Sequence, residues 1–221
     1  MTNVVLGLVG YYQFIRGYPL GPELMERLEA MAWPKIEVEL KELNWGPVAI
    51  VQDFQANPIK YDRIVLIAAV VRGARKGTVT CRKWLGGELE VLAVQDRIFE
   101  AVTGIISVDN LLVIGEHFGI WPKEVILIEV ELPDDSVGNL VLKELAIDHD
   151  AGEVTCVGQH PIAPNEKKIV ETIAALANIA VAQGIEGLPD IVPLTVNDLT
   201  PLADICHNQL IDDVRRTAPV N

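Results

Sequence analysis

The segment Ile64–Val71 (IVLIAAVV) has eight residues and not one polar side chain. An apolar run of this length is typical of a strand that is covered on both faces, as in a parallel sheet between two layers of helices. Val4–Val9 is a second run of this kind, and it ends at Gly10. A sheet with both faces buried requires helices on both sides, so these two runs restrict the fold more than any other feature of the chain.

Strand and helix patterns alternate along the rest of the chain, which predicts β-α-β units around a mostly parallel sheet, arranged as a three-layer α/β/α sandwich. Further strands are expected at Ile36–Leu43, Thr78–Trp84 and Glu124–Leu132, and helices at Glu23–Met31, Pro47–Gln55, Val94–Val102, Asn110–Phe118 and Lys167–Ala182. The strict apolar–polar alternation of Ile36–Leu43 indicates a strand with one solvent-exposed face, near an edge of the sheet. We expect one domain over residues 1–183, followed by a linker and a C-terminal helical extension over residues 184–221, with the helix at Thr200–Arg215.

The charge balance excludes several classes of partner. The chain has 18 Lys and Arg residues against 31 Asp and Glu residues, a formal net charge of −13, which argues against nucleic acid and anionic membrane surfaces. No uninterrupted apolar run reaches the roughly 18 residues of a membrane span, and the first ten residues lack the basic start of a signal peptide. The cysteines Cys81, Cys156 and Cys206 are too widely separated for a CxxC site or a disulfide framework. We therefore expect a cytoplasmic protein.

Ligands of an open α/β sheet bind at the carboxyl ends of its strands, so the loop after the first strand is a candidate site. This loop carries four aromatic residues, Tyr11, Tyr12, Phe14 and Tyr18. Val9 stands where the dinucleotide fingerprint requires its second glycine, which argues against a nucleotide cofactor. The aromatic residues either pack as a small cluster under a long loop or form a surface that contacts a partner.

A run of basic residues follows the strand that ends at Val71. It comprises Arg72, Arg75, Lys76, Arg82 and Lys83 in an otherwise acidic chain. The run is either a solvated turn or a docking patch, in which arginine forks would hold an acidic segment or a terminal carboxylate.

The order and spacing of several short motifs resemble those of the hydrogenase maturation proteases, endopeptidases that trim the C-terminus of the large subunit of nickel-iron hydrogenases. The resemblance covers roughly residues 3–180. It implies the same three-layer fold, peptidase chemistry and a hydrogenase large subunit as partner. The matching residues are Val5-Leu6-Gly7, Leu20-Gly21-Pro22-Glu23, Tyr61–Val70, Arg72-Gly73, Gly77-Thr78-Val79, Asn110–Leu112, Phe118-Gly119 and Pro122–Val125.

The resemblance also implies where the metal ligands of the family would lie. The first carboxylate corresponds to Tyr18, the aspartate at the end of the central strand corresponds to Ala68, and the histidine corresponds to Asp109. Alanine has no donor atom, and a neutral phenol is a poor ligand for nickel. We therefore expect no metal or other cofactor, with nickel retained only if the site is rearranged.

The histidines offer no replacement site. His117, His149, His160 and His207 include no pair at the i, i+4 spacing of a helical metal site, and Glu116 and His117 point in different directions on a regular helix. A serine-nucleophile motif of the Gly-x-Ser-x-Gly type is also absent from the sequence.

Two functions follow from the resemblance. The first is a protease-like protein, without the usual metal site, that binds a partner or a substrate tail in hydrogenase maturation. The second is an active endopeptidase of that family with a rearranged site around Tyr18, Asp109 and Glu116. A small-molecule α/β enzyme is a third, weakly supported possibility.

Overall fold

The computed structural model describes residues 2–33, 35–102, 107–133, 136–142 and 162–200. The predicted helix beyond Thr200 lies outside these residues, as do Cys156, Cys206, His149, His160 and His207.

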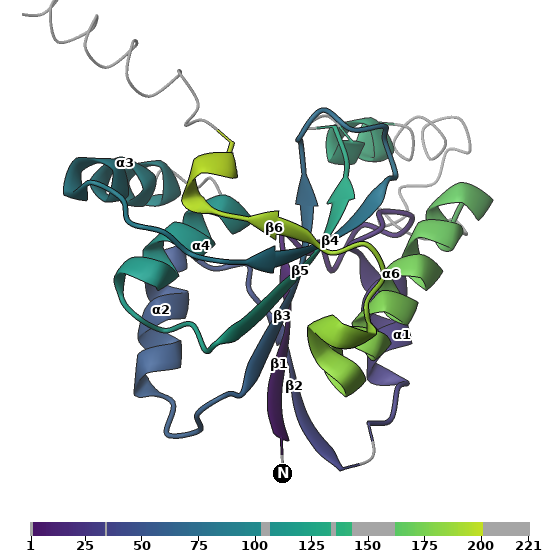
Figure 1. Cartoon of the computed structure of the whole chain (residues 1–221). Coiled ribbons are helices and arrows are strands. Elements are labelled where there is room, and N and C mark those ends of the chain that lie inside the picture. Colours follow the sequence, from purple (N-terminus) through teal and green to yellow (C-terminus); the bar gives the residue numbers. More distant parts are fainter. Residues whose placement is uncertain (1, 34, 103–106, 134–135, 143–161, 201–221) are drawn as a thin grey trace, which may run out of the picture.

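The centre of the molecule is a six-stranded sheet in the order β2-β1-β3-β5-β4-β6 (Figure 1). The neighbours β2, β1, β3 and β5 run parallel, whereas β4 is antiparallel to β5. The strands are β1 (Thr2–Val9), β2 (Ile36–Glu42), β3 (Arg63–Val70), β4 (Val79–Trp84), β5 (Glu124–Glu131) and β6 (Val192–Leu194). The central strands β1, β3 and β5 are buried along most of their length, as their apolar sequences predict.

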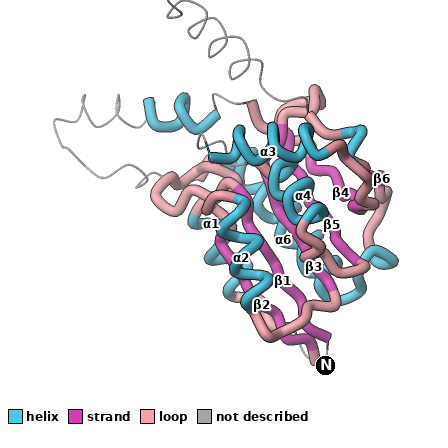
Figure 2. Tube along the Cα trace, turned by 90° about the vertical axis from the view of Figure 1, so that its left-hand side faces the viewer, coloured by secondary structure: helices cyan, strands magenta, loops and turns pink. Residues whose placement is uncertain are grey.

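Helices cover both faces of the sheet, which confirms the predicted α/β fold with a mostly parallel sheet (Figures 1 and 2). Helices α1 (Pro22–Glu29) and α6 (Pro164–Gln183) pack on one face. Helices α2 (Pro47–Ala56), α3 (Val91–Val102) and α4 (Val108–His117) pack on the other. Residues 136–142 form a further short helix. Each face therefore has its own hydrophobic core, and the sheet separates the two.

The stretch expected to be a linker contributes to the sheet. Strand β6 (Val192–Leu194) pairs in parallel with β4, and the buried Leu194 packs in the core on the face of α4. Thr195 then caps the short helix η2 (Val196–Asp198) with its hydroxyl. The chain then reaches Thr200, whose backbone N–H binds Asp109 of α4.

Helix α6 packs one apolar face against the sheet. Within the described part of the chain it is the one helix that meets the length and composition of a membrane span. Its apolar stripe, which includes Ile173, Ala177 and Val181, is fully buried against the sheet. Arg63 of β3 donates to the carbonyl groups of Ala180 and Val181, which fixes the end of the helix on the sheet.

Candidate functional site

A cavity of about 540 Å³ lies at the carboxyl ends of β1 and β3. We refer to it as the sheet-end cavity. Its walls come from the loop after β1, the end of β3, helices α3 and α4, and Thr200. This is the edge of an open α/β sheet at which ligands bind. The position therefore makes the cavity the first candidate for a functional site.

The loop after β1 places Tyr18 in this cavity. Gly21 precedes α1, and a side chain there would approach the carbonyl oxygens of Ile15 and Tyr18 to 2.5 and 2.8 Å. Pro22 then starts α1 at a position where a proline costs the helix no hydrogen bond. Glycine is thus required for the tight turn that packs Tyr18 beneath the helix start.

Asp109 lies in the first turn of α4, where a negative charge is favoured. Ser107 caps this helix by accepting a hydrogen bond from the backbone N–H of Asn110 at 3.1 Å. The carboxylate of Asp109 accepts from Arg72 Nη2 at 2.8 Å, from Arg72 Nη1 at 3.4 Å and from the Thr200 N–H at 2.9 Å. Both oxygens of Asp109 are therefore occupied by donors from this chain.

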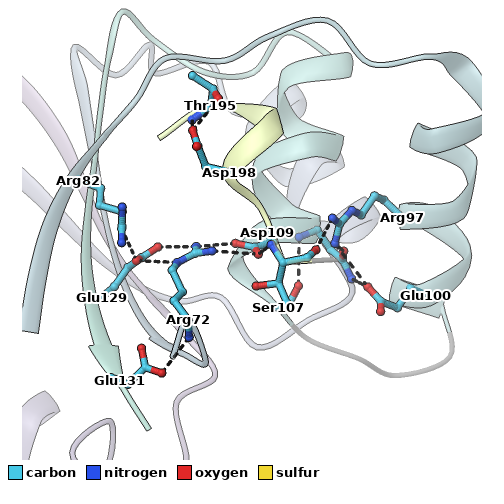
Figure 3. Close-up of polar contacts among 12 residues, drawn as sticks. Arg72, Arg82, Arg97, Glu100, Ser107, Asp109, Glu129, Glu131, Thr195 and Asp198 are labelled. Atoms are coloured by element: carbon cyan, nitrogen blue, oxygen red, sulfur yellow. Dashed lines mark hydrogen bonds and ion pairs between the residues drawn. The ribbon is translucent and has the colours of Figure 1, made fainter. Parts of the chain in front are cut away.

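Arg72 joins Asp109 to a second buried carboxylate (Figure 3). Its Nε and Nη2 donate to the two oxygens of Glu129 at 2.8 and 2.6 Å. Arg82 of β4 donates to the same carboxylate at 2.7 Å. Glu129 is 1 % exposed. A carboxylate this deeply buried requires such charge-assisted hydrogen bonds, and two arginines supply them.

The sheet register explains why Arg72 can reach this position. Glu129 of β5 has Ala68 of β3 and Thr80 of β4 as its register partners, and both side chains are small. The backbone N–H groups of Arg72 and Gly73 both donate to Glu131 at 2.8 Å, which anchors the turn after β3.

Burial alone would lower the pKa of the Arg72 guanidinium, but the hydrogen bonds and charges of Glu129 and Asp109 outweigh it and raise the pKa above its usual value. Arg72 is thus a permanent cation between two carboxylates.

A second polar group lies at the α3 side of the cavity. Arg97 donates to the carbonyl oxygen of Thr200 at 2.6 Å and to the side chain of Asn110 at 3.3 Å. Asn110 in turn donates to Glu100 at 2.8 Å. Since Asp109 binds the N–H of Thr200, helices α3 and α4 together hold this residue at the cavity wall.

The arrangement does not fit the nickel that the resemblance implies. Ala68 offers no donor, and Asp109 is bound to Arg72. Burial, and to a lesser extent the charge interaction with the Tyr12 phenol, raises the pKa of Tyr18 above its usual value, so this phenol stays neutral. Within the residues that the structure describes, no group of three or more His, Cys, Asp or Glu side chains is placed to hold a metal ion.

The three positions taken from the resemblance do not share one cavity. Tyr18 and Asp109 both line the sheet-end cavity, whereas its β3 wall is formed by Ala69, Val70 and Val71. Ala68 is 1 % exposed and points into the core on the face of α4. Ala68 lies one residue deeper in the sheet than these three residues, which end β3 and begin the turn after it.

The aromatic loop residues divide into core and surface. Tyr11 and Tyr18 are buried, and the Asn44 side chain bonds both backbone polar groups of Tyr11. Tyr12 is 44 % exposed and lies edge-on to the Tyr18 ring, with the centroids 5.4 Å apart. Phe14 is 74 % exposed. Tyr11 and Tyr18 thus pack in the core, whereas contact of Tyr12 and Phe14 with a partner stays a prediction.

The basic run divides in the same way. Arg72 and Arg82 were expected at the surface, but their side chains are 11 % and 19 % exposed and bind Glu129. Their charge is therefore used inside the protein. Arg75 and Lys76 are exposed and lie on the turn between β3 and β4.

Sequence reasoning missed Glu129, Glu131 and Arg97. The first two had a detectable signal, because the carboxyl end of the β5 sequence alternates Ile128, Glu129, Val130 and Glu131 after an apolar run. Such an alternation indicates that one face of the strand becomes polar at this end. Arg97 had no signal, since a charged residue on a helix is ordinarily a solvated one.

No family model matches the chain, and no curated protein matches it. Solved structures do. An endopeptidase from Escherichia coli is 16 % identical with a TM-score of 0.46, and the match covers 81 % of this chain and 93 % of that one. A hydrogenase 2 maturation peptidase from Thaumarchaeota archaeon SCGC_AB-539-E09 is 14 % identical with a TM-score of 0.39, covering 80 % and 95 %. A pyrrolidone carboxyl peptidase from Fervidobacterium islandicum AW-1 is 12 % identical with a TM-score of 0.38, covering 79 % and 95 %.

Hydrogenase maturation peptidases, the family that the sequence resembles, are thus among the solved structures to which this chain is similar. At these identities the similarity is one of fold. The chemistry of the site rests on this chain's own residues.

Proposed function

We propose that this protein is a divergent relative of the hydrogenase maturation proteases that binds a partner polypeptide at the sheet-end cavity without cleaving it. The observation that carries the proposal is the position of Arg72. Its guanidinium lies between Asp109 and Glu129 and supplies the positive charge that these buried carboxylates need. The partner is a hydrogenase large subunit in the cytoplasm, and the metal-dependent chemistry of the family has been lost.

The protonation chemistry of the site supports this proposal. A general base must accept a proton, and each oxygen of Asp109 and Glu129 already accepts a hydrogen bond from a cation. The buried phenol of Tyr18 is held neutral by its raised pKa and is a weak nucleophile. No side chain in this cluster is set up to activate water for peptide hydrolysis.

The active-endopeptidase alternative requires Tyr18, Asp109 and Glu116 to converge. Glu116 instead accepts a hydrogen bond from Trp84 Nε1 at 2.7 Å and lines a separate hollow with His117. Tyr18 and Asp109 line the sheet-end cavity. The distribution of these residues over two cavities favours binding over catalysis.

The proposal is tested by capture of a hydrogenase large subunit on the immobilised full-length protein. The subunit is supplied in two forms from the same genome, the precursor with its C-terminal extension and the processed form. We expect retention of the precursor and weaker retention of the processed form. Failure to retain the precursor would overturn the partner assignment, and release of a shortened precursor would establish the endopeptidase alternative.

A further inference from the structure

Three hollows adjoin one another along the carboxyl-end surface of the molecule. The first is the sheet-end cavity, the second is a hollow of about 140 Å³ beside residues 136–142, and the third is a hollow of about 700 Å³ between the β3–β4 turn and the start of α6. Tyr18 and Leu132 line both the first and the second. Lys76 and Glu166 line both the second and the third. The hollows therefore adjoin one another through these shared residues, and we call the three together the carboxyl-end groove.

The part of the groove nearest the sheet is apolar at its surface. Tyr12 and Val71 line the sheet-end cavity and are 44 % and 46 % exposed. Leu132 and Leu140 continue the apolar lining into the second hollow. The charged side chains in the first cavity are already paired, Asp109 with Arg72 and Arg97 with Glu100. This part of the groove therefore suits apolar side chains of a bound segment and favours neither acidic nor basic ones.

The other end of the groove is basic. Arg75, Lys76 and Lys168 line the third hollow, and all three side chains are exposed. Among the described residues none of them forms an ion pair or a side-chain hydrogen bond, although the chain as a whole carries a formal charge of −13. Glu166 is the single acidic residue in this lining. A surface of opposite sign to the rest of the molecule attracts negatively charged segments and repels basic ones.

We infer that the carboxyl-end groove binds an extended polypeptide segment of a partner in which apolar residues are directly followed or preceded by acidic ones. The apolar residues occupy the sheet-end cavity, and the acidic residues pair with Arg75, Lys76 and Lys168. This inference rests on the proposed function, because it gives the chemistry of the segment that the same site would bind. The apolar part supplies affinity, whereas the basic end supplies orientation and association rate.

The test uses fluorescein-labelled synthetic peptides and the full-length protein, with binding followed by fluorescence anisotropy. One peptide joins four apolar residues to four glutamates, a second has the same composition with the two kinds alternating, and a third has only the glutamates. Both chain directions of the first peptide are measured. We expect one direction of the joined peptide to bind at least tenfold more tightly than the other two peptides. Equal binding of the joined and alternating peptides, or of the glutamates alone, would overturn the inference.

Two charge-reversed variants locate the bound segment. Arg75→Glu with Lys76→Glu should weaken binding of the joined peptide at least tenfold at low salt and less at high salt. Lys60→Glu with Lys123→Glu is the control, because it changes the net charge by the same amount and both lysines are exposed but precede β3 and β5 at the opposite end of the sheet. It should change binding less than twofold. An equal effect of the two variants would show a response to net charge only and would contradict the groove.

The outcomes for the groove and for the proposed function are separable. Peptide binding without capture of a hydrogenase precursor would support the inference that the groove binds a peptide and would overturn the assignment of a hydrogenase as partner. Capture of the precursor that is unchanged in Arg75→Glu with Lys76→Glu would support the proposed function and overturn the groove.

Discussion

Ala68 and Glu129 are register partners on β3 and β5, and the small side chain of Ala68 leaves the Glu129 carboxylate to be bound by Arg72 and Arg82. With Asp109, this cluster has two carboxylates and two guanidinium groups, so its charges balance below the protein surface. The same alanine stands at a position where the resemblance implies a metal-binding aspartate. One side chain thus accounts both for the missing ligand and for the space around the arginine–glutamate pair.

Removal of Arg72 should be strongly destabilising. Arg72→Ala would leave the buried Glu129 with Arg82 as its remaining cation and the buried Asp109 with only the Thr200 N–H as donor. Breaking a buried ion pair in this way costs about 3–5 kcal/mol of unfolding free energy. Arg72→Lys keeps the charge but loses the two-pronged contact, so an intermediate loss is expected. Urea denaturation measures these values. Arg75→Ala, three residues further along at the surface, is the control and should stay within about 0.5 kcal/mol of the parent protein. A loss below about 1 kcal/mol for Arg72→Ala would contradict the structural role of the cluster.

Restoring the family's aspartate should not restore a metal site. Ala68→Asp would place a third carboxylate next to Glu129 in a position that is 1 % exposed, at a cost of several kcal/mol. Ala69→Asp is the matched control, because Ala69 lines the sheet-end cavity and its carboxylate could reach water. Thermal unfolding with and without nickel tests both variants. A stable Ala68→Asp protein whose melting temperature rises with nickel would show that the site can still hold a metal.

Within the aromatic loop, substitution of an exposed residue should weaken partner binding, and substitution of a buried residue should lower stability. Phe14→Ala removes a side chain that is 74 % exposed, so the melting temperature should stay unchanged while capture of the partner weakens by about 1–3 kcal/mol. Tyr18→Ala removes a side chain that is 4 % exposed and should cost about 3–5 kcal/mol of stability. If Phe14→Ala lowered the melting temperature and left capture per folded molecule intact, the loop would be core and the docking role would be wrong.

Cys81 should contribute to alkaline unfolding. Burial raises the pKa of this thiol from 9.0 to about 11. Its stabilising contribution is therefore complete below pH 9, where the thiol is protonated in both states, and is lost as the pH rises towards 11. The loss amounts to about 2–3 kcal/mol at 1.36 kcal/mol for each pKa unit. Denaturation between pH 8 and 11 should show a shallower decline in Cys81→Ala than in the parent protein. Identical slopes would contradict the burial of a protonated thiol.

The arrangement of helices and strands could be predicted because it depends on local patterns. The apolar runs at Val4–Val9 and Ile64–Val71 identify the buried parallel strands, and the alternation at Ile36–Leu43 identifies the edge strand β2. Strand β6 could not be recognised, since three residues in a stretch rich in Gly and Pro carry no periodic signal. It forms only because β4 offers a free edge.

The position of the candidate site could be predicted from the sequence, but the hydrogen bonds and ion pairs within it could not. The carboxyl-end rule pointed to the loop that holds Tyr18, and the resemblance pointed to Asp109. The structure places both residues in the wall of one cavity, whereas their functional role stays a prediction. The pairing of Arg72 with Glu129 joins residues 57 positions apart, and only the β3–β5 register brings them together. A sequence without aligned relatives holds no trace of such a contact.

The mass of the hydrogenase precursor after incubation with this protein distinguishes binding from cleavage. The full-length protein, the precursor and nickel are mixed, the complex is isolated, and the intact mass of the precursor is measured by mass spectrometry. We predict that the precursor is retained and that its mass is unchanged after prolonged incubation. A precursor shortened at its C-terminus, with the shortening lost in Asp109→Asn, would show an active endopeptidase and contradict binding without cleavage.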